Sequence, residues 1–70
     1  MTNDLDTLLL AAHDKGDKSS LVSLYAKAAD QAASVDAACF YLTHAYIFAL
    51  EIGHADTADL YARLKHHHRV

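Results

Sequence analysis

The sequence predicts an all-α protein of four antiparallel helices, arranged as two helical hairpins. Alanine and leucine are frequent, proline is absent and only two glycines occur, a composition that favours helix. No alternating run of β-branched residues and no Asn-Gly or Asp-Gly turn is found, so strands are not expected. Gly16 and Gly53, about 37 positions apart, each separate two stretches with helical periodicity. Each glycine is therefore expected to form the turn of one hairpin.

The first helix is expected over about residues 4–15. Asn3 is a candidate N-cap, and Gly16 follows the last periodic residue, where a left-handed backbone conformation is favourable for glycine. Four apolar side chains recur at helical spacing and predict one buried face: Leu5, Leu8, Leu9 and Ala12.

The second helix is expected over about residues 18–33, with Asp17 as its N-cap. Its apolar positions form the most regular stripe in the chain, and alanines at one end allow close approach of a neighbouring helix. The stripe consists of Leu21, Leu24, Tyr25, Ala28, Ala29 and Ala32.

The third helix is expected over about residues 37–52, capped by Ser34 or Asp36 and ended by Gly53. It is apolar on nearly every side, as a central helix or a membrane span is. The apolar run is short for a bilayer and contains His44, so we expect a central helix with neighbours on at least two sides and no membrane span.

The fourth helix is expected over about residues 55–67, with Asp56 as its cap and Leu60, Tyr61 and Leu64 as its apolar positions. No linker or low-complexity segment interrupts the chain, so residues 1–70 are expected to form a single helical domain.

The second half of the chain resembles a tetratricopeptide or Sel1-like helical repeat. The resemblance is carried by Tyr41-Leu42, Ala45-Tyr46, Gly53, Ala58 and Leu60-Tyr61. It implies antiparallel helix hairpins with a concave face that binds peptides; a compact four-helix bundle is the other arrangement that the pattern allows. The chain also looks like small proteobacterial helical proteins of unknown function.

Charge and cysteine content limit the functional classes. The net charge of −3 disfavours a nucleic-acid binder, which normally presents a basic face. The acidic N-terminus does not look like a signal peptide, and the lone Cys39 fits a reducing compartment. These features predict a cytoplasmic protein.

The histidines suggest a metal site only weakly. His66, His67 and His68 are consecutive, so on a helix their side chains point about 100° apart and do not share one ion well. We therefore predict no metal site and no cofactor. The weak alternative is a metal-responsive protein that uses these three histidines with His54 or Asp56.

Two other combinations are candidate catalytic pairs. Cys39 and His44 are five positions apart and fall on different helix faces, whereas His44 and Glu51 share a face. No phosphate loop, nucleophile elbow or zinc motif occurs, so we do not expect an enzyme. A small-molecule enzyme would need a pocket that holds His44 and Glu51.

The strongest functional hypothesis is a small protein–protein interaction module or regulatory adaptor subunit. It rests on the third helix, which is too apolar for so short a chain to cover. The alternative is an obligate homodimer of structural role that buries the same surface. The side chains expected to bind a protein partner or a second copy are Tyr41, Tyr46, Phe48, Tyr61 and Leu64.

Overall fold

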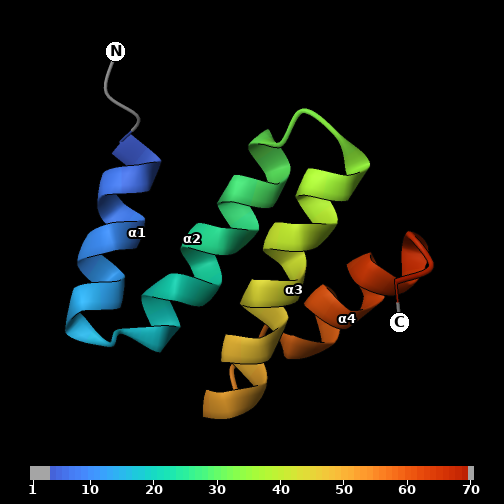
Figure 1. Ribbon diagram of the computed structural model, residues 1–70. Coiled ribbons are helices and arrows are strands. Elements are labelled where there is room, and N and C mark those ends of the chain that lie inside the picture. Colours follow the sequence, from blue (N-terminus) through green and yellow to red (C-terminus); the bar gives the residue numbers. More distant parts are fainter. Residues whose placement is uncertain (1–3, 70) are drawn as a thin grey trace.

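The computed structural model describes residues 4–69 and confirms an all-α fold (Figure 1). No strand occurs among these residues. The four helices are α1 (Asp4–Lys15), α2 (Lys18–Gln31), α3 (Val35–Ile52) and α4 (Thr57–His66).

Helix bounds differ from the predicted ones by up to two residues. Helix α2 ends two residues early because Ala32 is extended, with φ −67° and ψ 143°. Helix α3 starts two residues early, directly after Ser34. Helix α4 starts two residues late, at Thr57, and ends one residue early, at His66. The proposed cap Asn3 lies outside the described residues.

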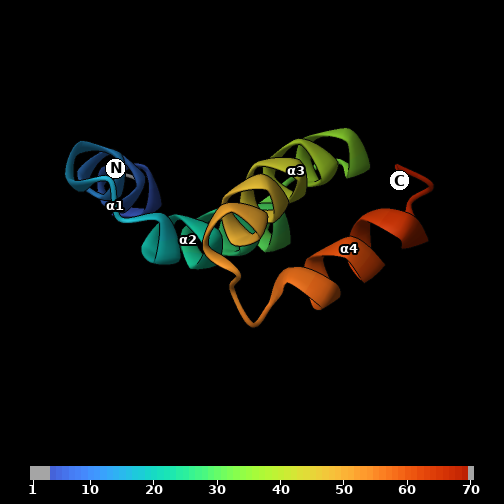
Figure 2. The ribbon, with the colours of Figure 1, turned by 90° about the horizontal axis from the view of Figure 1, so that it is seen from below.

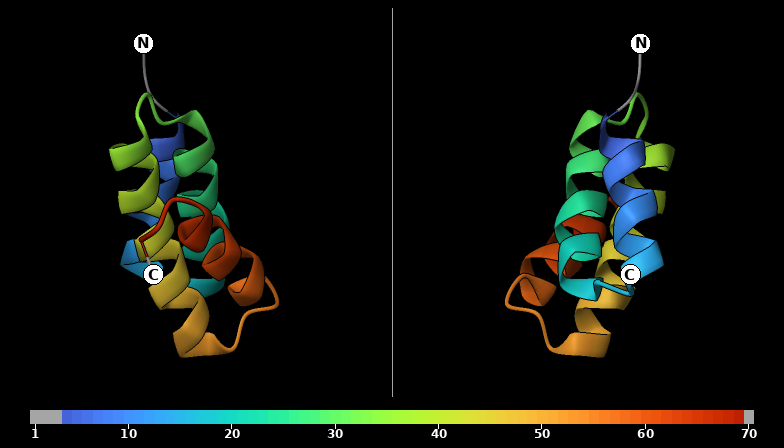
Figure 3. Two further views of the ribbon diagram at one scale, coloured as in Figure 1. Left: turned by 90° about the vertical axis from the view of Figure 1, so that its right-hand side faces the viewer. Right: turned by 90° about the vertical axis from the view of Figure 1, so that its left-hand side faces the viewer.

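Both predicted hairpins form, and the most extensive helix contact joins them. Helix α1 packs on α2 and α4 packs on α3, while α2 and α3 pair along most of their length (Figure 1). Figure 2 shows α1 and α3 on either side of α2, with α4 beneath α3. The two side views in Figure 3 place α1 and α4 at opposite edges of the molecule. The Cα trace spans 32 × 29 × 13 Å, so the molecule is flattened and exposes much of its surface.

Three helices end with the same backbone hydrogen bonds. A left-handed residue follows each helix, directly after α1 and α3 and two positions after the last residue of α4: Gly16 (φ 64°), Gly53 (φ 62°) and His68 (φ 60°). The next amide then reaches back five residues and satisfies a carbonyl of the last turn. These bonds run from Asp17 to Ala12 (2.9 Å), from His54 to Ala49 (2.9 Å) and from Arg69 to Leu64 (3.0 Å).

Hydrogen bonds to side chains cap the N-termini of α2 and α3. The Asp17 carboxylate accepts hydrogen bonds from the hydroxyl (2.7 Å) and amide (3.2 Å) of Ser20, and both bonds lower the pKa of Asp17. Of the two candidates for α3, Ser34 is the cap, accepting from the Ala37 amide at 3.1 Å. Asp56 stands at the start of α4 but makes no capping hydrogen bond with its side chain. The predicted position of this cap is confirmed, and the backbone amide of Asp56 donates to His54 Nδ1 at 3.0 Å.

The hydrophobic core lies between α2, α3 and α4. Helix α1 contributes one buried side chain, Ala12, which is 6% exposed. Leu5 and Leu9 are half-buried, but Leu8 is 51% exposed, so the predicted buried face of α1 is only partly covered. The core cluster consists of Val22, Ala29, Cys39, Leu42, Ala45, Ala49, Leu60 and Leu64.

Candidate functional site

Tyr25 is the centre of an aromatic cluster that joins three helices. Its ring stacks on His44 and Phe48 of α3, with centroids 5.2 and 6.0 Å away, and Tyr41 lies at 6.3 Å. The hydroxyl lies 2.9 Å from Nε2 of His13 on α1. Burial, and then the neighbouring Tyr41, raise the pKa of Tyr25 above its ordinary value. The periodicity of the sequence places Tyr25 in the apolar stripe of α2, but its contacts with His13 and His44 have no sequence signal.

The five predicted partner-binding residues do not form one groove. Tyr41 and Phe48 belong to the Tyr25 cluster. Tyr46 and Tyr61 pair with each other where α3 meets α4, with ring centroids 5.9 Å apart. The four tyrosine and phenylalanine side chains are therefore split between two flanks of α3, and their partner-binding role stays a prediction.

Leu64 requires a correction. It is only 1% exposed, because α4 turns this side chain into the core against α3. The apolar periodicity identified Leu64 as an inward position, but it did not distinguish a core residue from the floor of an open groove.

Three of the five large apolar side chains that are exposed on α3 form a stripe that the prediction missed. Phe40 is 59% exposed, Ile47 50% and Leu50 55%. With the exposed Thr43, these residues are spaced by three and four positions and share one helix face. We call Phe40, Thr43, Ile47 and Leu50 the α3 stripe.

The stripe is open because α3 has neighbours on only part of its circumference. Cys39, Leu42, Ala45 and Ala49 face α2 and α4 and are buried. No other described helix covers the opposite side of α3. By length and composition α3 is apolar enough to cross a membrane, but core helices of soluble proteins meet the same criterion.

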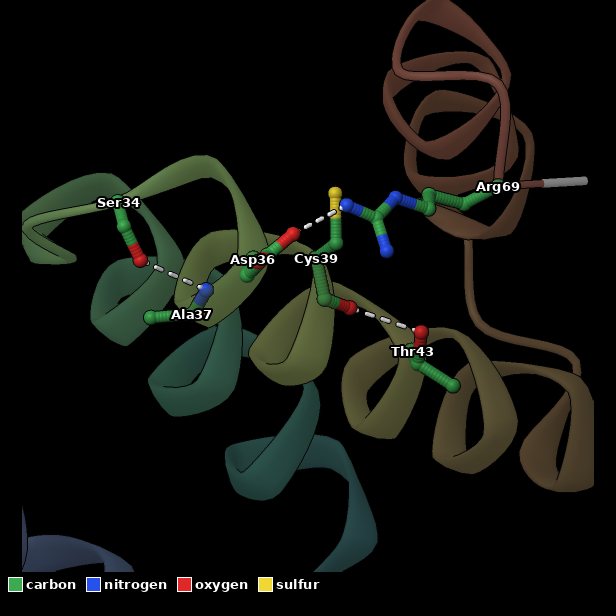
Figure 4. Close-up of polar contacts among 6 residues, drawn as sticks. All are labelled: Ser34, Asp36, Ala37, Cys39, Thr43 and Arg69. Carbon is green, nitrogen blue, oxygen red and sulfur yellow. Dashed lines mark hydrogen bonds and ion pairs between the residues drawn. The ribbon is translucent and has the colours of Figure 1, made fainter.

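A charged corner lies beside one end of the stripe (Figure 4). Arg69 donates a hydrogen bond to Asp36 at 2.5 Å, which raises the pKa of the guanidinium. Figure 4 shows the sulfur of Cys39 directed toward this pair, and the Thr43 hydroxyl donates to the Cys39 carbonyl at 2.8 Å. Cys39 is only 3% exposed and belongs to the core cluster, so its thiol is shielded from solvent.

Neither candidate catalytic pair is assembled. His44 Nδ1 lies 2.9 Å from the Phe40 carbonyl oxygen, which can only accept, so Nδ1 carries the hydrogen. Glu51 instead pairs with Lys18 of α2 at 2.8 Å. Cys39 lies in the core, while the ring of His44 lies in the Tyr25 cluster. His44 is thus hydrogen-bonded to neither Cys39 nor Glu51.

The C-terminal histidines are not gathered around a common point. The rings of His66 and His67 meet edge to face at 5.1 Å, and His68 adopts the left-handed backbone that ends α4. His54 lies in the turn before α4, where its Nδ1 accepts a hydrogen bond from the Asp56 amide. Within residues 4–69, no three His, Cys, Asp or Glu side chains are placed to hold one metal ion.

Comparisons with known proteins give no relative for this chain. No protein-family model, curated protein or solved structure matches it. The resemblance to tetratricopeptide or Sel1-like repeats therefore gains no support from them.

Proposed function

We propose that this protein is a small protein–protein interaction module, acting as an adaptor or regulatory subunit without catalysis of its own. The observation that carries the proposal is the α3 stripe, where three large apolar side chains of one helix are each at least half exposed. We further propose that it works in the cytoplasm, since Cys39 is a free, buried thiol.

Exposure of these side chains is unfavourable for an isolated chain. Burying a Phe, Ile or Leu side chain contributes about 1.5–3 kcal/mol, and half of this contribution is left unrealised at each position of the stripe. Scattered single apolar residues are normal at a surface, but neighbouring ones on one helix face mark an interaction site more often. A binding partner would cover the stripe and recover this free energy.

The polar surroundings support the same function. Lys18 and Glu51 form an ion pair at one end of the stripe, and Asp36 and Arg69 form another at the opposite end. An apolar centre with a charged rim is the usual composition of a protein interface. Rim charges of this kind contribute more to specificity than to affinity.

Site-specific photocrosslinking in cells tests the proposal. A photoreactive phenylalanine analogue is placed at Ile47, in the centre of the stripe, and at the exposed Lys27 of α2 as a matched control. We expect a discrete covalent adduct from position 47 and none from position 27. Absence of an adduct at 47 in the folded protein would contradict the proposal.

A further inference from the structure

We infer that residues 67–69, which follow α4, form a latch on the first turns of α3 that opens while the helices stay folded and then gives solvent access to the thiol of Cys39. The latch is independent of the α3 stripe and of any partner that covers it. Three observations support it: an exposed ion pair holds the segment on α3, the buried thiol lies beside this pair, and the segment contains a left-handed residue that is not glycine.

An ion pair between Arg69 and Asp36 joins the latch to α3. Asp36 lies in the first turn of α3 with its side chain 88% exposed, and the side chain of Arg69 is 43% exposed. Exposed ion pairs contribute little net free energy and are weakened by salt. The closed position of the latch therefore depends on an interaction that can break while the hydrophobic core stays intact.

The thiol of Cys39 lies beside this ion pair. Figure 4 shows the sulfur directed toward the pair, and Cys39, Asp36 and Arg69 line the same surface cavity of about 500 Å³. The pKa of Arg69 is raised first by its hydrogen bond to Asp36 and then by the charge of Cys39, so the guanidinium is within electrostatic reach of the sulfur. Withdrawal of Arg69 removes the wall of the cavity that belongs to the latch and widens the approach to the thiol.

The backbone of the latch is held in an unfavourable conformation. His68 has φ 60°, which places its Cβ in the left-handed region that favours glycine. This conformation allows the Arg69 amide to donate to the Leu64 carbonyl at 3.0 Å. Such a conformation persists only where the surrounding contacts maintain it. The backbone of His68 therefore favours opening of the latch, and the ion pair of Arg69 opposes it.

Opening of the latch does not require α4 to leave α3. Leu60 and Leu64 attach α4 to the core, and they are only 2% and 1% exposed. Residues 67–69 lie beyond this attachment, at the end of the helix. Local openings of this kind cost less free energy than global unfolding, and they depend weakly on denaturant because they expose little surface. Cys39 is therefore expected to react from the folded state of the protein.

The rate at which iodoacetamide alkylates Cys39 in the full chain measures opening of the latch. The thiolate sulfur displaces iodide and forms one S–C bond, the thiol proton passes to solvent, and Cys39 is the one cysteine that can react. We expect a rate well above that of the unfolded chain multiplied by the fraction of unfolded protein. The rate should also stay nearly constant at low urea concentrations. A rate with the urea dependence of global unfolding would overturn the latch.

Removing the cation of the latch should make Cys39 more accessible. We expect Arg69→Gln to accelerate alkylation of the folded protein about twofold to fivefold, as loss of one exposed ion pair allows. Loss of a neighbouring positive charge by itself disfavours the thiolate and slows the reaction. An acceleration therefore reports access to the thiol, whereas an unchanged or slower rate would overturn the latch. Circular dichroism checks that the variant stays helical.

The chain contains a matched control for this substitution. Arg63 of α4 forms an ion pair of the same length, 2.5 Å, and its side chain is 41% exposed, but its partner is Asp30 of α2. Arg63→Gln therefore removes the same charge and the same kind of interaction away from the thiol. It should leave the alkylation rate of the folded protein unchanged. Equal acceleration in Arg63→Gln and Arg69→Gln would overturn the latch.

Salt tests the ion pair without a change in backbone or packing. The Debye length falls from about 30 Å to about 3 Å between about 0.01 M and 1 M salt, so the attraction between Arg69 and Asp36 weakens. We expect alkylation of the parent protein to accelerate over this range and that of Arg69→Gln to change little. Iodoacetamide is uncharged, so its own approach is not steered. The same salt dependence in both proteins would overturn the latch.

A substitution that favours the closed latch should have the opposite effect. His68→Gly removes the unfavourable Cβ at φ 60° and should slow alkylation about twofold to fivefold. The control is His67→Gly, because His67 has φ −94° and gains nothing from glycine in the closed state. It should not slow the reaction. An unchanged or faster rate in His68→Gly would overturn the latch.

Discussion

The hydroxyl of Tyr25 on α2 lies 2.9 Å from Nε2 of His13, in the last turn of α1. The ring of His13 also meets Tyr25 and Phe48 edge to face, at 5.8 and 6.0 Å. Since Ala12 is the one buried side chain among the described residues of α1, these contacts add to the attachment of α1 to the other helices.

Removing the Tyr25 hydroxyl should loosen α1. We expect Tyr25→Phe to lower the free energy of unfolding by about 0.5–1 kcal/mol, the usual net contribution of one hydrogen bond. Hydrogen exchange of the α1 amides should accelerate more than that of α3. The control is Tyr61→Phe on α4, whose hydroxyl makes no hydrogen bond among the described residues. Equal acceleration in all helices would contradict a local role.

Stability should fall at alkaline pH in a way that depends on Tyr25. The folded protein holds the phenolic proton more tightly than the unfolded chain, because burial raises the pKa of Tyr25 above 10.0. The contribution of protonated Tyr25 to the free energy of unfolding is therefore complete below pH 10.0. It is lost as the pH rises through the higher pKa that Tyr25 has in the folded state. Urea unfolding between pH 8 and 11 should show a smaller decline in Tyr25→Phe than in the parent protein.

Loss of the cap of α3 should destabilise the whole fold. Ser34→Ala removes the acceptor of the Ala37 amide and should cost about 1 kcal/mol. For a chain of this size that corresponds to a fall of roughly 4–8 °C in Tm. Ser23→Ala, at an exposed position inside α2, should leave Tm unchanged or slightly raise it, since alanine is the better helix former. Similar losses in both variants would argue against capping.

The end of α4 offers a stabilising substitution. His68 has φ 60°, a conformation that disfavours residues with a Cβ, so His68→Gly should raise the free energy of unfolding by about 0.5–1 kcal/mol. The neighbouring His67 has φ −94° and needs no glycine. His67→Gly should therefore lower stability, and thermal melts of the two variants should shift in opposite directions.

Two leucines distinguish the core from the surface. Leu42→Ala, at 1% exposure, should cost about 2–5 kcal/mol, a large part of the about 4–10 kcal/mol expected for 70 residues. Leu10→Ala, at 67% exposure, should change the free energy of unfolding by less than about 0.5 kcal/mol. Comparable losses in urea titrations would mean that α1 is more deeply packed than the structure shows.

Local signals account for the helices and most of their ends. Gly16 and Gly53 are predicted as turns because only glycine adopts positive φ at little cost, and both have the expected conformation. Asp17 is predicted as a cap because a short acceptor before an apolar stripe satisfies free amides. The left-handed backbone conformation of His68 was not predicted, because no feature of the neighbouring sequence indicates it. Asp56 occupies the predicted cap position of α4, but its side chain accepts no capping hydrogen bond.

The sequence by itself determined the all-α class, the four helices and the excess of apolar surface on α3, because these depend on spacing and turn chemistry within a few residues. Only the tertiary structure decided which apolar side chains are buried. It placed Leu64 in the core, left Phe40, Ile47 and Leu50 at the surface, and gathered His13 and His44 around Tyr25. When a helix is apolar on all sides, its sequence does not indicate where the neighbouring helices lie. The exposed face of α3 is therefore fixed by the direction from which α2 and α4 pack on it.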